Sequence, residues 1–212
     1  SGSISTSSGS WPGPDGARLI SAGRFNQLRG GGSTRNIQTA FPFMASQTLP
    51  RRPRLIGPRK TFAIVASMYN ETCMGGLLES TKSELLGIMP TASVPLYRVP
   101  GAWEIPVCAE YVLQHTHADV IIALGVVIRG ETGHADLITA AVAQELQVMS
   151  TRHLTPVINM VLLVNSEQEA RERCFGDKMN RGVEAARAAL NMAELFTKLH
   201  TAYPLPKSKQ ED

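Results

Sequence analysis

The sequence predicts an α/β protein built as a three-layer sandwich, in which a four-stranded parallel sheet is covered by helices on both faces. Two observations support this fold class. Apolar runs of strand length alternate with helical patterns from Lys60 onward, and the run 120–128 is rich in β-branched residues without polar alternation. Such a run is typical of a parallel strand that is buried on both faces. Strands separated by helices are connected by right-handed crossovers.

Each predicted element follows from its residue pattern. The four strands are short apolar runs at 62–66, 94–99, 120–128 and 156–164. The first helix follows from a stripe of side chains at helical spacing, formed by Met74, Leu78, Thr81, Leu85 and Ile88. Further helices are predicted at 104–113, 132–151, 166–174 and 180–199. The last of these has an apolar side that we expect to cover one face of the sheet, formed by Val183, Ala186, Ala189, Leu190 and Ala193.

Length and composition indicate one packed domain of roughly 150 residues and a tail, because the chain has 212 residues, 43% of them hydrophobic and 18% charged. No stretch approaches the ~20 consecutive apolar residues of a transmembrane helix, so we expect no membrane partner. The three cysteines, Cys73, Cys108 and Cys174, form no CxxC pair. This spacing disfavours a disulfide framework or a zinc ribbon. We therefore expect a cytoplasmic protein without a metal site.

Basic residues are concentrated near the N-terminus. Residues 1–60 carry eight arginines and Lys60 against Asp15 alone, a net charge of +8, which leaves −5 for the rest of the chain. The Ser-, Gly- and Pro-rich composition predicts a disordered extension over 1–59, followed by a folded domain at 60–200 and a tail at 201–212. A solvated tail is the favoured interpretation of the extension, and an organelle-targeting segment is the alternative. Nucleic acid is expected to make only nonspecific contacts with it.

Three loops are expected at the carboxyl ends of the strands, where parallel sheets bind their ligands. The first two, at 67–71 and 99–106, contain aromatic and polar side chains. Tyr69 and Trp103 can stack on a heteroaromatic ring, and Asn70 and Glu104 can bind its polar edge. The alternative is that both aromatics are core residues and that Glu104 only stabilises a helix dipole.

The third loop, at 129–134, leads from a strand through Gly130 into a helix start. Free backbone N–H groups and the helix dipole make such a junction a candidate anion site. His134 would lie in the first helical turn, where the helix dipole and a bound anion shift its protonation in opposite directions, which suits proton transfer. The alternative is an ordinary surface histidine. The phosphate-loop, hydrolase and dinucleotide signatures GxxxxGK[ST], GxSxG and GxGxxG are missing.

The segments VPGAWEIP at 99–106, LGVVIRGETGH at 124–134 and NRGVEAA at 180–186, in this order and spacing, resemble the 6,7-dimethyl-8-ribityllumazine synthase family. The resemblance covers about residues 62–195 and implies a flavodoxin-like fold. It also implies condensation of 5-amino-6-(D-ribitylamino)uracil with 3,4-dihydroxy-2-butanone 4-phosphate, which releases phosphate and water in the penultimate step of riboflavin biosynthesis. These small molecules would be its substrates, and no cofactor is implied.

The resemblance also implies a role for each site residue by its position. His134 would transfer protons, and Arg173 would reach the phosphate from a neighbouring subunit. Without the resemblance, the surroundings of Arg173 are equally typical of a solvated helix. The rest of the phosphate site would be Gly130, Glu131 and Thr132, mainly through backbone N–H groups and the Thr132 hydroxyl. The pyrimidine and ribityl chain would be lined by Tyr69, Asn70, Ala102, Trp103, Glu104, Val126, Val127, Ile128 and Asn159.

The resemblance further implies a homopentamer, which in some members closes into an icosahedral 60-mer, and riboflavin synthase as an additional partner. Several positions depart from the family pattern. Asn159 replaces an aromatic residue, Asp177 replaces a common lysine, and Gly133 and Ala135 flank His134 where bulkier neighbours are usual. An active enzyme is the leading hypothesis. The alternatives are a low-activity lumazine- or flavin-binding or shell-forming paralogue, and an unrelated phosphate-binding protein of the same fold.

Overall fold

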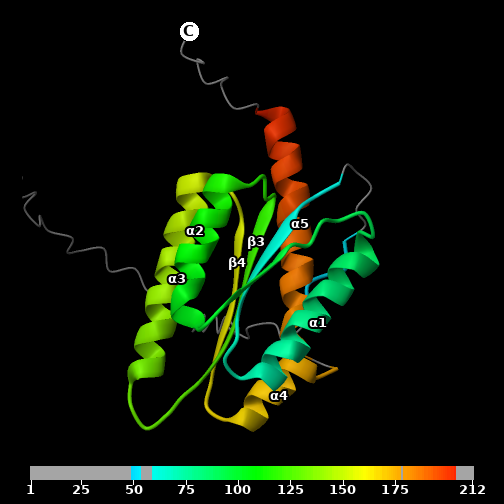
Figure 1. Ribbon diagram of the computed structural model, residues 1–212. Coiled ribbons are helices and arrows are strands. Elements are labelled where there is room, and N and C mark those ends of the chain that lie inside the picture. Colours follow the sequence, from blue (N-terminus) through cyan, green and yellow to red (C-terminus); the bar gives the residue numbers. More distant parts are fainter. Residues whose placement is uncertain (1–48, 54–58, 178, 204–212) are drawn as a thin grey trace, which may run out of the picture. The chain divides into compact units, whose positions relative to one another are not determined.

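The computed structural model describes residues 49–53, 59–177 and 179–203, so most of the predicted extension and tail lies outside the described residues. The described chain has the predicted alternation of strands and helices (Figure 1). Its elements are β1 (Phe62–Ser67), α1 (Glu71–Ile88), β2 (Leu96–Val99), η1 (Ala102–Glu104), α2 (Ile105–His115), β3 (Val120–Ile128), α3 (His134–His153), β4 (Val157–Val164), α4 (Glu167–Phe175) and α5 (Arg181–Ala202).

The four strands form one parallel sheet in the order β2-β1-β3-β4, as the sequence predicts. The predicted strand at 120–128 coincides with β3, which lies inside the sheet and is buried over its first seven residues. The strand predicted at 94–99 begins two residues late, at Leu96. Pro95 precedes it and has no N–H for a ladder, although its carbonyl oxygen accepts a hydrogen bond from the Ile64 N–H.

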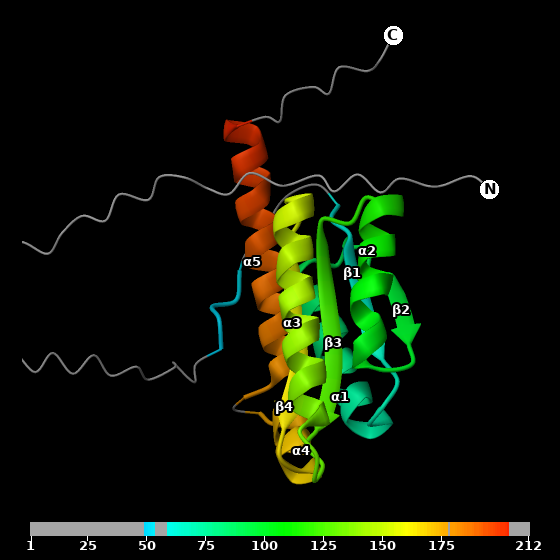
Figure 2. The same cartoon turned by 90° about the vertical axis from the view of Figure 1, so that its left-hand side faces the viewer.

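Helices cover both faces of the sheet, which confirms the three-layer prediction. The α1, α4 and α5 helices pack on the face that includes Phe62 and Ile64 of β1, and α2 and α3 pack on the face that includes Ala63 and Val65. Figure 2 shows the side of the molecule that α2 and α3 cover. No helix in the described part of the chain is both long enough and apolar enough to span a membrane.

Helix starts depend on local capping groups. The α5 helix begins after Asn180, whose side-chain oxygen accepts hydrogen bonds from the N–H groups of Gly182 and Val183. The α3 helix begins at His134 rather than at the predicted 132, so the loop after β3 is two residues longer than expected. The helix predicted from 104 begins as η1 and continues as α2, with Pro106 in the first turn, where its missing N–H has no consequence.

Candidate functional site

The loops that follow β1 and β2 are tied to each other and to β3. The Met68 N–H donates to the carbonyl oxygen of Pro100 at 3.3 Å. Asn70, in the left-handed conformation before α1, donates from its side-chain nitrogen to the carbonyl oxygen of Val126 at 2.8 Å. These contacts place the loops of three neighbouring strands at one edge of the sheet, which is the arrangement that the sequence predicts.

Gly101 lies against the ring of Tyr69 and the carboxylate of Glu104. A Cβ atom there would lie 3.3 Å from the ring of Tyr69 and 3.1 Å from Oε2 of Glu104, and this same carboxylate oxygen accepts the Gly101 N–H at 2.8 Å. Tyr69 is 70% exposed and Trp103 is 60% exposed. The alternative that both aromatics are core residues is therefore wrong for this chain. Their ring faces are accessible to a ligand.

The end of β3 supplies the rest of this edge. Val126 is buried, Val127 and Ile128 are half-buried, and the loop 130–133 is exposed. His134 is exposed and is the first residue of α3, so it lies in the first helical turn as predicted, although the helix begins two residues later than expected. Gly133, the residue before the helix, has no side chain that could cap it, so the N–H groups of the first turn receive no side-chain cap. A helix start of this kind can bind an anion.

Of the predicted residues, Asn159 lies elsewhere, whereas Ala102 follows Gly101 at the carboxyl edge. Asn159 pairs with Ala123 in the sheet, five residues before Ile128, which places it roughly 16 Å from the end of β3 along the strands. Ala102 is buried, so it can contribute only backbone or a methyl surface to a ligand site. Within one chain, Asn159 is therefore not part of the cluster at the carboxyl edge.

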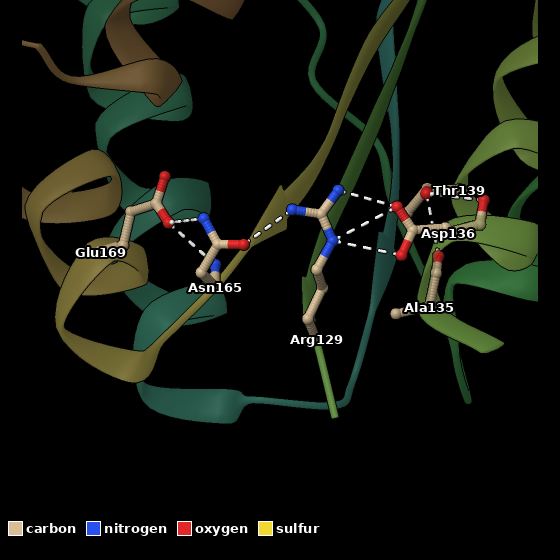
Figure 3. Close-up of polar contacts among 6 residues, drawn as sticks. All are labelled: Arg129, Ala135, Asp136, Thr139, Asn165 and Glu169. Atoms are coloured by element: carbon tan, nitrogen blue, oxygen red, sulfur yellow. Dashed lines mark hydrogen bonds and ion pairs between the residues drawn. The ribbon is translucent and has the colours of Figure 1, made fainter. Parts of the chain in front are cut away.

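The loop after β3 is bracketed by an ion pair between Arg129 and Asp136 (Figure 3). Nε of Arg129 lies 3.2 and 3.1 Å from the two carboxylate oxygens, and a terminal nitrogen lies 2.7 Å from Oδ1. The guanidinium of Arg129 holds the pKa of Asp136 below its ordinary value, and the carboxylate raises the pKa of Arg129. The pair closes the segment that contains Gly130, Glu131 and Thr132.

A second set of polar contacts links this loop to α4. The other terminal nitrogen of Arg129 donates to Oδ1 of Asn165 at 2.7 Å. Asn165 donates its backbone N–H and its side-chain NH₂ to Oε2 of Glu169, at 2.8 and 3.1 Å. Glu169 binds Arg173 through its other oxygen at 2.6 Å. Asp136, Arg129, Asn165, Glu169 and Arg173 thus form one continuous set of contacts, which we call the Asn165 network.

The pKa of Glu169 lies below its ordinary value, because of the hydrogen bond from the Asn165 backbone and, next, the contact with Arg173. Only Arg173 of the network is a predicted site residue. Arg129 and Asp136 could have been inferred as a pair of opposite charges flanking a glycine loop, but nothing in the sequence joins them to Asn165. No cluster of three or more His, Cys, Asp or Glu suitable for a metal ion occurs among the described residues.

These features define an α/β protein with a candidate ligand site at the carboxyl edge of a parallel sheet, where the loops after the strands carry exposed aromatic rings and an uncapped helix start. Residues 59–197 match the family model of 6,7-dimethyl-8-ribityllumazine synthase. The chain therefore belongs to the 6,7-dimethyl-8-ribityllumazine synthase family.

Individual relatives agree with the family model, and three bacterial proteins named 6,7-dimethyl-8-ribityllumazine synthase illustrate this. The protein from Mycolicibacterium gilvum is 43% identical over 154 residues, which cover 71% of this chain and 94% of the relative. The protein from Xanthomonas oryzae pv. oryzae is 38% identical over 140 residues, covering 66% and 91%. The protein from Xylella fastidiosa is 37% identical over 139 residues, covering 65% and 90%.

Proposed function

We propose that the chain condenses 5-amino-6-(D-ribitylamino)uracil with 3,4-dihydroxy-2-butanone 4-phosphate to give 6,7-dimethyl-8-ribityllumazine, phosphate and water. The observation that carries this proposal is the junction after β3, where an exposed glycine loop leads into an uncapped helix whose first residue is His134. Family membership over 59–197 supports the same reaction. The alternative of a low-activity paralogue has no observation in its favour.

The pyrimidine would bind beside Tyr69 and Trp103, whose exposed rings can stack on it. Asn70 and Glu104 would orient its polar edge and the ribityl hydroxyl groups. The Asn70 oxygen is available for this because its nitrogen binds the Val126 carbonyl, and Glu104 keeps one carboxylate oxygen beyond the one that binds Gly101. Ala102 and the segment 126–128 would line the pocket floor.

The phosphate of the ketone would bind the N–H groups of Gly130, Glu131 and Thr132 and the start of α3, with the Glu131 carboxylate pointing away. In the reaction, the pyrimidine amine attacks the ketone to form an imine, phosphate is eliminated and the ring closes. His134 would move protons in these steps, while the other groups position the reactants. Arg173 would supply a bidentate guanidinium to the phosphate of an adjoining subunit, which explains why it lies on α4 rather than in the loop.

Proteins of this family act on small molecules and are generally oligomeric. We propose a homopentamer for this chain. The exposed apolar surface on α2 and α3 fits a subunit contact in such an assembly, because exposed apolar patches mark protein interfaces. This surface comprises Val107, Tyr111, Leu137 and Val148, and it adjoins a groove of about 480 Å³ between the two helices. Closure of pentamers into a 60-mer and association with riboflavin synthase remain proposals carried by the resemblance.

We also propose that the chain consists of an N-terminal extension at 1–59, an enzyme domain at 60–200 and a tail at 201–212. A cytoplasmic location fits the three free cysteines, and the basic extension supports import into an organelle as the alternative. Any contact with nucleic acid would be nonspecific and would be made by the extension.

Pro50 and Arg52 precede the proposed enzyme domain and contact its helices. The Pro50 carbonyl oxygen accepts a hydrogen bond from Arg187, and Arg52 lies 3.5 Å from Glu84.

A steady-state assay with both substrates tests the proposal. The assembled protein should form lumazine, and Arg173→Ala should raise the KM for the phosphorylated ketone roughly 10- to 100-fold, since a hydrogen bond to a charged group contributes about 1.5–3 kcal/mol. Arg171→Ala is the matched control, because Arg171 is an exposed arginine on the same helix. Its KM should change less than about twofold. An assembled protein that forms no lumazine would refute the proposed reaction.

A further inference from the structure

The side-chain amide of Asn165 lies between a cation and an anion (Figure 3). Its oxygen accepts from Arg129 at 2.7 Å, and its nitrogen donates to Glu169 at 3.1 Å. Asn165 follows directly after β4, next to the end of β3 that carries Arg129. A single amide therefore connects the loop after β3 with the first turn of α4.

An amide is the group that this position requires. Asparagine presents an acceptor and two donors from one planar group, so it can face a guanidinium on one side and a carboxylate on the other. An aspartate would keep the acceptor for Arg129 but would place negative charge against Glu169. An apolar side chain of the same size would lose both contacts.

Fold stability does not explain the network well. Arg129 and Asp136 are about half exposed, and exposed ion pairs contribute little to the free energy of unfolding, while they fix long side chains in single rotamers. The Asn165 network instead fixes relative positions. One end closes the loop 130–132, and the other end holds the guanidinium of Arg173 through Glu169.

We propose that Asn165 is a positioning residue for phosphate binding, which acts by holding Arg129 and the Glu169–Arg173 pair in fixed relation to each other. This inference rests on the proposed function, in which the loop 130–132 and Arg173 both contact phosphate. Asn165 itself does not touch the substrate. Its effect is carried by the two arginines, one that shapes the loop of its own subunit and one that serves the neighbouring site.

The test uses Asn165→Asp and Asn165→Leu in the full-length assembled protein. Both variants should raise the KM for the phosphorylated ketone and the inhibition constant of inorganic phosphate by about fivefold. The KM for the pyrimidine and kcat should change little, because the side-chain hydrogen bonds of Asn165 reach Arg129 and Glu169 and not Tyr69, Trp103 or His134. Tm should also change little, because exposed ion pairs contribute little to the free energy of unfolding. Sedimentation checks that assembly is intact. If Asn165→Leu does not assemble, the nearly isosteric Asn165→Asp carries the test.

Two controls separate positioning from a structural role. Ser166→Ala removes the cap of α4, where the Ser166 hydroxyl oxygen accepts from the Glu169 N–H at 3.1 Å, but leaves the amide contacts in place. Glu194→Gln removes a comparable carboxylate that pairs with a cation four residues away, outside the network. Neither control should alter phosphate affinity. An equal rise in KM for Ser166→Ala would overturn the proposal, because loss of helix order would then explain the effect.

The outcomes also distinguish this inference from the proposed function. If Arg173→Ala leaves the KM for the phosphorylated ketone unchanged, the assignment of the phosphate site itself is refuted. If Arg173→Ala raises that KM while both Asn165 variants behave as the unaltered protein, only the positioning role is refuted. A parallel rise in the KM values of both substrates in the Asn165 variants would also contradict it.

Discussion

Replacement of Gly182 by alanine tests how α5 packs on α1. Gly182 is buried in the first turn of α5, and a Cβ atom at this position would lie 2.5 Å from the carbonyl oxygen of Leu77 and 2.8 Å from Cβ of Ser80. The nearest obstacle is the main chain of α1, so no side-chain rotation relieves the clash. The two helices would have to separate by roughly 0.9 Å to restore ordinary 3.4 Å contact.

The expected loss follows from two opposing terms. Overpacking of a core costs about 1–3 kcal/mol, and an unyielding backbone obstacle favours the upper part of that range. Alanine recovers about 1 kcal/mol through its higher helix propensity. We therefore expect the free energy of unfolding to fall by about 1–2 kcal/mol, which corresponds to a Tm decrease of roughly 2–8 °C for a domain of this size.

Gly75→Ala is the matched control. Gly75 is an exposed glycine in α1 whose added Cβ would meet nothing within 4 Å. This variant should gain about 0.5–1 kcal/mol, because only the propensity term applies. Urea unfolding of both variants at one protein concentration gives the comparison. If Gly182→Ala proves as stable as Gly75→Ala, the close approach of α5 to α1 is not present in the molecule.

Three further outcomes are expected. His134→Ala should lower kcat about 100-fold with little change in either KM, since a positioned proton-transfer group contributes about 10²–10⁴ in rate; an unchanged kcat in steady-state assays would remove its proposed role. Arg129 holds the pKa of Asp136 below 3.8. The contribution of this ion pair to the stability of the folded chain is therefore present above pH 3.8 and is lost as the pH falls through the lowered pKa. Asp136→Asn should accordingly flatten the decrease of Tm below about pH 4, and equal slopes would contradict this. Burial raises the pKa of the Cys174 thiol to about 12, so iodoacetamide at pH 8 should label the less buried Cys108 first, as read by peptide mass spectrometry; equal labelling would be the contrary result.

Most of the fold could be predicted because its pattern is local. The run 120–128 predicts β3 to the residue, since a strand covered on both faces must be apolar throughout. The NRGVEAA segment illustrates the limit. Its asparagine could be assigned as a helix cap, but the reason for glycine at 182 is a carbonyl group of α1 more than a hundred residues away. A contact between two helices that are distant in the sequence cannot be predicted from the residue pattern of either helix alone.

Part of the candidate site could also be predicted from local patterns, and part of it depends on contacts between distant segments. The loops with Tyr69, Trp103 and His134 could be located from the sequence because strand ends in a parallel sheet share one edge. The Asn165 network could not, because Arg129 and Asn165 are 36 positions apart and meet only through the pairing of β3 with β4. The sequence therefore indicates which side chains can contact a ligand, and the structure adds the side chains that fix the positions of those residues.

The distribution of the site residues makes assembly part of the proposed mechanism. On one chain, Tyr69 and Trp103 are largely exposed, so a ring stacked on either would keep one face in water. Asn159 lies far from the end of β3, and Arg173 lies on α4 beyond the loop. Phosphate binding and proton transfer are strongest in a site from which water is excluded. An adjoining copy that covers the aromatic rings, and adds its own Arg173 and Asn159, would provide such a site, which a lone chain lacks.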